Sequence, residues 1–378
     1  MKIAIIESFN GGSHKSWIEG LMKNSTHDII SISLKGKYWK WRMMGGAITL
    51  AKKFLLSNFK PDLFLLSDMV DATIFKSLVG HKFFNTPIAM YFHENQLSYP
   101  WNYNEKFNEN KKMHYGFINY SSALISDHVF FNSIFHMNSF LNDVKQFLKQ
   151  FPDHNELGSI EKIKAKSSTL PLGIDLKRFD KHKINEKGKL PLILWNHRWD
   201  YDKDPSTFFE VMQKLKNEKE KFELVILGQN IKIMPEIFRV ANEKLKENIR
   251  YIGYCKTLSE YSKWLYLSDI LPVTNIQDFF GISIVEAVYC GTYPLLPERL
   301  TYPDLFNYRK NSKLFYTSKN DFFYKLKHCI NSVDQIRHSS YSSLVKRYDW
   351  SELIAEYDAQ FLSVINKYRQ NNKLYMTL

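Results

Sequence analysis

Short apolar segments that end in polar residues alternate with longer amphipathic segments along most of this chain. In the first half these apolar, β-rich segments are KIAIIES (2–8), PDLFLLSD (61–68), TPIAMYFHEN (86–95) and DHVFFNS (127–133). Stretches with helical spacing, such as SHKSWIEGLMKN, lie between them. This alternation predicts a parallel, doubly wound α/β sheet, which binds ligands at the carboxyl ends of its strands. The polar residues at the strand ends are therefore the first candidates for a functional site.

A second series of the same kind begins after the polar linker DKHKINEKGKLP (180–191). Its apolar segments are LILWNHRWD (192–200), FELVILGQN (222–230), IRYIGY (249–254), ILPVTN (270–275) and YPLLPE (293–298). A chain of 378 residues also suits two domains better than one. We expect two Rossmann-like domains that face a cleft, over 1–179 and 190–347. An amphipathic helix within 348–378 is expected to cross back to the N-terminal domain.

Composition limits the classes of function. The three cysteines, Cys255, Cys290 and Cys329, are widely spaced, without a CxxC pair or an adjacent histidine cluster. This argues against a zinc site or a disulfide framework and fits a reducing cytoplasm. No stretch of the sequence approaches the roughly 20 apolar residues that a membrane span needs. The opening MKIAIIESF is typical of a first strand and not of a secretion signal. We therefore expect a cytoplasmic protein.

The chain is strongly basic. Its 52 Lys and Arg residues against 39 Asp and Glu give a net charge of +13, which favours a polyanionic partner such as RNA or an anionic membrane surface. A lysine-rich composition of the kind that AT-rich genomes encode would give the same balance without a functional reason. Both interpretations stay open at this point.

Two polar clusters follow strands in the first half. Gly11 and Gly12 come after the first strand, and Ser13 then opens a helix, so that free backbone N–H groups could meet a phosphate. The pattern is not GxGxxG, which disfavours a nicotinamide dinucleotide site, and an ordinary tight turn is the alternative.

The second cluster is HENQ, in which four polar side chains could hold sugar hydroxyls or orient a proton transfer. Its residues are His93, Glu94, Asn95 and Gln96.

In the second half, Arg198 and Lys203 come directly after a strand. A diphosphate leaving group must be neutralised by a metal or by fixed cations, and Arg and Lys both serve this purpose. We read no DxD motif in a strand-end loop, so fixed cations are expected and no metal or other cofactor. A solvated surface pair is the alternative interpretation.

The stretch DFFGISIVEAVYCGTYPLL carries two carboxylates eight positions apart. Asp278 lies in the loop after a predicted strand, and Glu286 lies in the helix that begins near Gly281. A carboxylate that accepts two ribose hydroxyl hydrogen bonds is a common way to hold a nucleotide. The plain alternative is that Asp278 caps the helix and Glu286 faces water.

The segment KGKYWKWR (35–42) interleaves cations with aromatic residues. Lys40, Trp41 and Arg42 suit an unstacked base and its phosphates, as in an anticodon loop. An edge loop whose tryptophans pack on the core is the alternative.

Taken together, the acidic-x7-Glu pattern, the Arg/Lys pair, the Gly-Gly turn, PLGID (171–175) and the closing helix resemble a retaining glycosyltransferase with the GT-B fold, of the large family-4 group. Longer runs are similar to the tRNA-queuosine mannosyltransferases: IIESFNGGSHKSW, YWKWR, YFHENQLSYP, FNSIFHMNSF, FPDH, WNHRWDYDKDP and FFGISIVEAVYCGTYPL.

This resemblance implies that mannose passes with retention from GDP-mannose to the cyclopentenediol of queuosine in tRNA(Asp). It implies donor contacts at Gly11, Gly12, Arg198, Lys203, Gly281 and Glu286, with Glu286 on the ribose. His93 and Asp278 would face the transferred sugar, although the wider group usually has Glu where this chain has Asp278. Acceptor contacts would include Ser13, His14, Lys40, Trp41, Arg42, Glu94, Asn95 and Gln96.

Two alternatives remain for the function. A glycosyltransferase of lipid-linked or surface polysaccharide synthesis would share the donor motifs and use the basic charge against anionic membranes. A non-catalytic RNA-binding protein on a GT-B scaffold is also open, because a fold does not fix a function.

Overall fold

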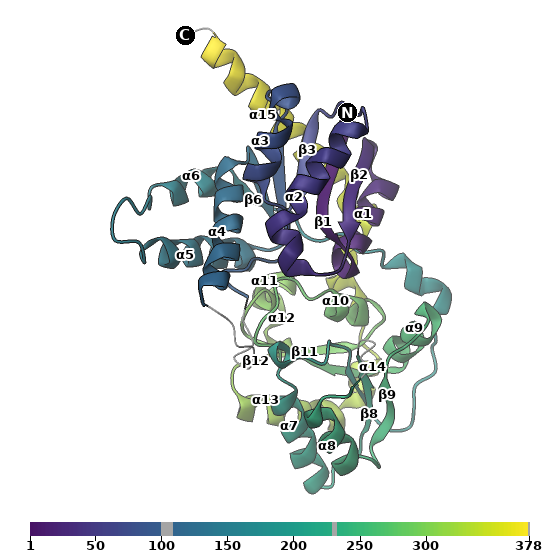
Figure 1. The fold of residues 1–378 in the computed structure, drawn as a ribbon. Coiled ribbons are helices and arrows are strands. Elements are labelled where there is room, and N and C mark those ends of the chain that lie inside the picture. Colours follow the sequence, from purple (N-terminus) through teal and green to yellow (C-terminus); the bar gives the residue numbers. More distant parts are fainter. Residues whose placement is uncertain (100–108, 229–232, 377–378) are drawn as a thin grey trace. The chain divides into compact units, whose positions relative to one another are not determined.

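The computed structural model describes residues 1–99, 109–228 and 233–376, which form two compact units (Figure 1). The first unit comprises residues 1–174 and 350–378, and the second comprises 175–349. The chain therefore leaves the first unit after Ile174 and returns to it at Trp350. No helix in these described ranges is both long enough and apolar enough to span a membrane.

The first unit contains a six-stranded sheet in the order β2-β1-β3-β4-β5-β6, with all described strand pairs parallel. The strands are β1 (Lys2–Asn10), β2 (Asp28–Lys35), β3 (Leu63–Ser67), β4 (Ile88–Phe92), β5 (His128–Phe131) and β6 (Ser167–Thr169). Strands β3, β4 and β5 are buried along their whole length, as expected for a parallel sheet covered on both faces. The strand order reverses between β1 and β3, and such a switch point is where an open α/β sheet binds ligands.

Side chains that alternate along the strands separate the two faces of this sheet. Phe92 and Phe131 pack into a core with helices on one face, whereas Tyr91 contacts Trp17 and Tyr357 on the other. The helices are α1 (Gly12–Asn24), α2 (Trp39–Leu56), α3 (Ala72–Phe83), α4 (Glu109–Ile125), α5 (Ile134–Leu148), α6 (Ser159–Ala165) and α15 (Trp350–Met376).

Helix α15 packs against α1 within the first unit (Figure 1). Trp17 donates its indole N–H to the Tyr357 hydroxyl at 3.0 Å. Gly20 leaves the space that the Trp350 ring fills, because a Cβ atom on Gly20 would lie 1.9 Å from Nε1 of Trp350. The closing helix is therefore a structural part of the N-terminal unit.

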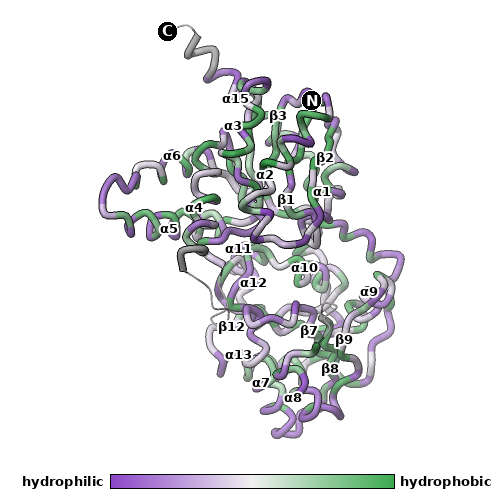
Figure 2. The backbone as a smooth tube through the Cα atoms, viewed as in Figure 1, coloured by the Kyte–Doolittle hydropathy of each residue, from purple (hydrophilic) through white to green (hydrophobic). Residues whose placement is uncertain are grey.

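The second unit holds a six-stranded sheet in the order β12-β11-β10-β7-β8-β9, again parallel in every described pair. Its strands are β7 (Leu192–Trp195), β8 (Glu223–Leu227), β9 (Ile249–Gly253), β10 (Ile270–Pro272), β11 (Tyr293–Pro297) and β12 (Phe315–Tyr316). The apolar colouring of β8 in Figure 2 marks a buried central strand. The order reverses between β7 and β10, which places a second switch point there. The two doubly wound sheets predicted from the sequence are confirmed.

Helices surround this second sheet. They are α7 (Pro205–Asn217), α8 (Glu236–Lys244), α9 (Leu258–Leu267), α10 (Ile282–Tyr289), α11 (Tyr302–Leu305), α12 (Tyr308–Asn311), α13 (Lys319–Asn331) and α14 (Val333–Arg337). Short 3-10 turns complete the chain: η1 (Lys177–His182), η2 (Tyr201–Lys203), η3 (Ser312–Leu314), η4 (Ser342–Leu344) and η5 (Lys346–Tyr348). Trp195 of β7 packs against Phe208 of α7, which anchors the loop after β7 beside the switch point.

Candidate active-site residues at the strand ends

Lys203 is a buried cation at the switch point of the second sheet. It closes η2, directly after β7, and only 8% of the residue is exposed. Its Nζ donates to the Gln277 carbonyl at 3.0 Å and lies 3.1 Å from Oδ2 of Asp202. The same Nζ lies 3.8 Å from Oδ2 of Asp278, in the loop after β10. Lys203 therefore joins two strand-end loops, and the alternative of a solvated surface residue is wrong for it.

Arg198 lies at the surface beside this cluster, with 47% of its side chain exposed. Its Nη2 lies 3.3 Å from Oδ2 of Asp202, and its Nη1 lies 4.0 Å from Oδ2 of Asp200. A half-exposed guanidinium has a forked donor geometry that suits an anionic ligand. The strand-end loop thus presents one buried and one exposed cation.

Asp200 and Asp202 do have DxD spacing after β7, contrary to the expectation that no such motif lies in a strand-end loop. In the structure, Asp202 is an anionic partner of Lys203 and Arg198. Among the described residues, no three His, Cys, Asp or Glu side chains are arranged to hold a metal ion. Metal-independent chemistry stays a prediction.

Asp278 does not cap the helix that follows it. The N-cap of α10 is Gly281, which has a φ of 93° and forms no side-chain capping hydrogen bond. Oδ2 of Asp278 instead accepts from Nδ2 of Asn275 at 2.9 Å and from the Tyr302 hydroxyl at 3.0 Å. Burial, followed by the nearby Asp278 carboxylate, raises the pKa of Tyr302 well above its ordinary value, so its hydroxyl remains a donor. These contacts fix the orientation of the Asp278 side chain.

Glu286 is buried and does not face water, so the plain interpretation of this residue is also wrong. Its Oε1 accepts from Nη2 of Arg178 at 2.6 Å, and its Oε2 accepts from the Tyr261 hydroxyl at 2.9 Å. Burial raises the pKa of Glu286, while the charge of Arg178 opposes that rise. Each carboxylate oxygen has a second lone pair, so Glu286 can still accept hydrogen bonds from a diol.

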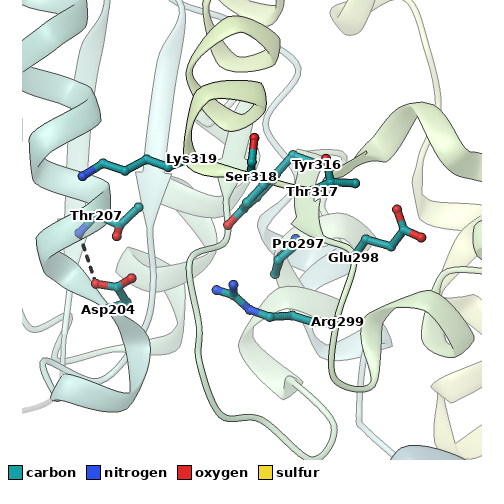
Figure 3. Close-up of a pocket in the computed structure, with 9 residues that line it drawn as sticks. All are labelled: Asp204, Thr207, Pro297, Glu298, Arg299, Tyr316, Thr317, Ser318 and Lys319. Carbon is teal, nitrogen blue, oxygen red and sulfur yellow. Dashed lines mark hydrogen bonds between the residues drawn. The ribbon is translucent and has the colours of Figure 1, made fainter.

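Arg299 supports the loop that carries Asp278. Its Nε donates to the Asn275 carbonyl at 3.0 Å and its Nη2 to the Thr274 carbonyl at 2.8 Å. Figure 3 shows this guanidinium in a pocket of about 140 Å³ between the β11 and β12 ends and the start of α7, where Asp204 caps the helix through the Thr207 N–H. Arg299 therefore stabilises the backbone of the loop that carries Asp278.

In the first unit, His14 and His93 form the centre of a second polar cluster. Nδ1 of His14 lies 2.9 Å from Oε2 of Glu7, and both side chains are buried. Burial alone would lower the pKa of His14, but the Glu7 carboxylate raises it to about 9. The His93 ring lies 4.1 Å from the His14 ring between centroids. Burial and then the His14 charge lower the pKa of His93 well below its ordinary value, so His93 is neutral.

Asp68, directly after β3, completes this cluster. Its Oδ1 accepts from the His93 backbone N–H at 2.8 Å, and Asn119 donates its Nδ2 to the Asp68 carbonyl at 2.8 Å. Burial raises the pKa of Asp68 to about 8, against the charge of His14. The ends of β1, β3 and β4 therefore bring ionisable side chains together at the first switch point.

The Gly-Gly turn begins α1 without a side-chain cap. Gly12 has a φ of 53°, a left-handed conformation that favours glycine, while Gly11 is the N-cap and Ser13 is exposed. A Cβ atom on Gly36 would lie 2.8 Å from the Gly11 Cα, so the two loops also touch closely. The geometry fits both an open helix N-terminus and an ordinary tight turn.

The remaining HENQ residues partly hold their own loop together. Asn95 Oδ1 accepts from the Ser98 N–H at 2.8 Å, and the Gln96 N–H donates to Oδ1 of Asn119 at 2.9 Å. Nε2 of Gln96 donates to Oε1 of Glu94 at 3.1 Å. Of these four residues, His93 has the strongest link to the ionisable cluster.

The segment at the start of α2 divides its aromatic residues between core and solvent. Trp39 packs against a small core cluster that includes Tyr115, 5.4 Å away between ring centroids. Trp41 is 63% exposed, and Tyr38 is 76% exposed with a φ of 56°. Lys40 lies over the Trp39 ring at 5.6 Å, and Arg42 Nε donates to the Lys35 carbonyl at 3.4 Å. The edge-loop alternative therefore describes Trp39 but not Trp41.

Comparison with known proteins assigns both units. A family model described as the tRNA-queuosine alpha-mannosyltransferase N-terminal domain matches residues 2–174, and the glycosyl transferases group 1 model matches residues 177–322. A tRNA-queuosine alpha-mannosyltransferase of Drosophila melanogaster is 33% identical over 318 residues, which cover 80% of this chain and 81% of that protein. The chain belongs to the tRNA-queuosine alpha-mannosyltransferase family. It is a glycosyltransferase that transfers a hexose, so the alternative of a non-catalytic RNA-binding protein is excluded.

Solved structures support the fold of this family member. Sucrose-phosphate synthase from Thermosynechococcus elongatus aligns with a TM-score of 0.69 at 12% identity, over 97% of this chain and all of that chain. A glycosyltransferase from Rickettsia africae aligns with a TM-score of 0.61 at 16% identity, over 98% of this chain and 99% of that one. At such identities the likeness concerns the fold alone, and it confirms the predicted GT-B class.

Several residues of the two strand-end clusters were not identified from the sequence. Arg178 lies just after the PLGID motif, and Tyr261 lies on α9, so their meeting on Glu286 had no local signal. Glu7 and Asp68 were visible as acidic residues at the ends of apolar strands, but their partners come from other strands. The roles assigned to the predicted residues stay predictions.

Proposed function

We propose that this family member transfers mannose from GDP-mannose, with retention, to the cyclopentenediol of queuosine in tRNA(Asp). The observation that carries the proposal is the 33% identity to the Drosophila melanogaster enzyme, whose name specifies tRNA, queuosine and mannose. The relationship covers 80% of the chain, and the family model for the N-terminal domain matches the whole first sheet. Acceptor and donor sugar are carried over from that relative.

We assign the diphosphate of the donor to Arg198 and Lys203. As the bond to the anomeric carbon lengthens, negative charge grows on the departing diphosphate, and cations that stabilise it more than the intact donor lower the barrier. Lys203 suits this role because its contacts with Gln277 and Asp202 hold the ammonium in place before the donor binds. The free N–H groups of Gly11 and Gly12 at the start of α1 are proposed as further phosphate contacts.

The two carboxylates of the second unit have separate proposed roles. Glu286 would accept the ribose hydroxyls, with Arg178 and Tyr261 holding its carboxylate in place. Asp278 would face the sugar, where positive charge develops at the anomeric carbon. Lys203, Asn275 and Tyr302 hold the Asp278 carboxylate in place. Asp278 is one methylene shorter than the Glu that is usual in the wider group, so a bridging water is proposed to complete its contact with the sugar. The acceptor hydroxyl would attack from the leaving-group face and pass its proton to the diphosphate.

We place the tRNA on side chains at the start of α2. Trp41 offers a ring face for an unstacked base, and Lys40 and Arg42 supply cations for its phosphates. The exposure of Trp41 on the first unit and a net charge of +13 support this assignment, while Lys40 and Arg42 are half-buried. Ser13, His14, Glu94, Asn95 and Gln96 are proposed to meet the queuosine itself, and His93 the transferred sugar. The reaction is proposed to be metal-independent and cytoplasmic.

A transfer assay tests the proposal. The purified protein is incubated with radiolabelled GDP-mannose and tRNA(Asp) that either contains or lacks queuosine, in the presence of EDTA. We expect label only in the tRNA that contains queuosine, and excess UDP-sugars should not compete with the donor. Label in both tRNAs, or in neither while anionic glycolipid is labelled, would contradict the proposal and favour the polysaccharide alternative.

A second experiment tests the tRNA surface. Replacing both Lys40 and Arg42 by Ala should weaken tRNA binding. The plot of log K against log salt concentration should also become less steep by about 2, because each cation that contacts a phosphate releases counterions on binding. Binding of GDP should not change. The matched control replaces Lys216 and Lys244, on α7 and α8 of the second unit, by Ala. Equal tRNA affinity of the Lys40/Arg42 variant and the wild type would contradict the assignment.

A further inference from the structure

Buried polar atoms without a protein partner gather at the first switch point. Within the described residues, Oδ2 of Asp68, both ring nitrogens of His93 and Nδ2 of Asn95 form no hydrogen bond. All three residues are at least nine-tenths buried. Leaving such a group unpaired costs about 1–3 kcal/mol, so native proteins keep such groups for a ligand, water or catalysis. Together these atoms mark a site for a molecule rich in hydroxyl groups.

The protein holds the Asp68 carboxylate in one orientation. Oδ1 accepts from the His93 backbone N–H at 2.8 Å, and the Asp68 carbonyl accepts from Nδ2 of Asn119 at 2.8 Å. With one oxygen and the backbone fixed, Oδ2 is a preorganised hydrogen-bonding group, and no rotamer search is needed when a ligand arrives. The neighbouring His93 ring is fixed as well, between the rings of His14 and Trp17.

The charges around Asp68 suit a neutral diol better than an anion. Glu7 and His14 form a buried ion pair that balances itself, and Glu94 adds a negative charge nearby. A phosphate at this position would meet Glu94, which repels it, while Asp68, whose pKa is raised to about 8, is a neutral hydrogen-bonding carboxyl near pH 7. Hydroxyl groups can donate to a carboxyl oxygen and exchange hydrogen bonds with a neutral imidazole, which has one donor and one acceptor nitrogen. This chemistry distinguishes the site from the cationic cluster of the second unit.

We propose that Asp68 binds the acceptor directly, with Oδ2 accepting a hydrogen bond from one hydroxyl of a vicinal diol, beside His93, which faces the transferred sugar. This inference rests on the proposed function, because the cyclopentenediol of queuosine is the diol in question. Asp68 then selects for the modified nucleoside, whereas the surface at the start of α2 binds any tRNA through base stacking and phosphates. Specificity for queuosine resides in the buried cluster.

The test compares two tRNAs and two matched variants. Affinity is measured for tRNA(Asp) with queuosine and for the same tRNA without it, and their ratio reports recognition of the modification. In Asp68→Asn, Oδ1 can still accept from His93, while an amide donor replaces the Oδ2 acceptor. Asp127→Asn is the control, because Asp127 is half-buried at the amino end of β5 and accepts from the Ile88 N–H at 2.8 Å.

The wild type and Asp127→Asn should show the same preference for the tRNA with queuosine. Asp68→Asn should lose about 5- to 150-fold in that ratio, the range for leaving one buried polar group unpaired, with unchanged affinity for the other tRNA. If Asp68→Asn does not fold, Asp68→Glu, which displaces the carboxylate by one methylene, should show the same fall.

Two other results would overturn the inference in different ways. A folded Asp68 variant that keeps the full ratio would overturn the role of Asp68 and leave the proposed function intact. A wild type that binds both tRNAs equally, and transfers no hexose to either, would overturn the proposed function and this inference with it.

Discussion

At the scale of single residues, the ammonium of Lys203 is the group on which the donor assignment depends most. It is buried, and its three contacts come from two loops at the second switch point. Arg198 is more exposed and forms contacts with Asp202 and Asp200 only at 3.3 and 4.0 Å. The two cations should therefore contribute in different ways, with Lys203 acting on the transition state and Arg198 on capture of the donor.

Replacing Lys203 by Met should lower kcat on the order of 10²-fold, the loss measured for one preorganised charge donor, with a smaller change in donor KM. Lys216→Met on α7 is the control, since Lys216 contacts the Lys244 carbonyl and the exposed Glu247, away from the Lys203 cluster. Steady-state kinetics of both variants, with thermal unfolding to verify the fold, provide the test. Wild-type kcat in a folded Lys203→Met would remove Lys203 from the mechanism.

Protonation of His14 links stability to pH. The pKa of His14 is raised from 6.5 to about 9 in the folded chain, so between these values the folded state binds a proton that the unfolded state has lost. The free energy of unfolding should therefore fall as pH rises from 6.5 to 9, and the raised pKa of Asp68, about 8, adds a fall of the same sign. Glu7→Gln removes the main partner of that proton and should flatten the slope. Chemical denaturation at pH 6.5 and at pH 9 measures the fall in the free energy of unfolding for each protein. An equal fall in the wild type and in Glu7→Gln would contradict the Glu7–His14 assignment.

At the scale of elements, α2 separates a structural tryptophan from a proposed binding tryptophan. Trp39 packs on the core cluster with Tyr115, whereas Trp41 is mostly in solvent. Trp41→Ala should weaken tRNA binding by about 1–3 kcal/mol, the value of one stacked base, with little effect on stability. Trp39→Ala should lower the free energy of unfolding instead. A Trp41 variant that binds tRNA as the wild type does would show that this ring is not a stacking platform.

The packing of α15 on α1 allows a paired glycine test. A methyl group on Gly20 would overlap the Trp350 ring, so Gly20→Ala should destabilise the chain by about 1–3 kcal/mol. Gly80 lies in α3, and an added Cβ there would meet nothing within 4 Å. Gly80→Ala should therefore stabilise by about 0.5–1 kcal/mol, since alanine is the better helix former. Thermal unfolding compares the two, and a tolerated Gly20→Ala would show that α15 packs loosely.

The elements themselves were largely predictable, because apolar runs such as TPIAMYFHEN and ILPVTN carry both the strand and its polar end. Distant pairings were not. Glu286 is held by Arg178 from η1 and Tyr261 from α9, and no local pattern links three such separate segments. Likewise, Asp68 meets the His93 backbone only because β3 and β4 pair in one register. Sequence periodicity reports which face a residue occupies, whereas partners across a sheet depend on tertiary packing.

At the scale of the whole molecule, each unit is a doubly wound sheet with its polar residues at the switch point. The first unit collects neutral and acidic hydrogen-bonding groups around His93, and the second collects cations and carboxylates around Lys203. This division suits an enzyme whose N-terminal unit selects the acceptor and whose C-terminal unit binds a charged donor. The family assignment covers both units, and the division of acceptor and donor between them stays a prediction.

The most direct test of this account is the mass of the queuosine nucleoside after reaction. The protein is incubated with GDP-mannose and tRNA(Asp) that contains queuosine, the RNA is digested to nucleosides, and the products are separated and weighed by mass spectrometry. The account predicts that queuosine gains the mass of one hexose and that every other nucleoside keeps its mass. Unchanged queuosine, with protein shown to bind GDP-mannose, would contradict the central claim.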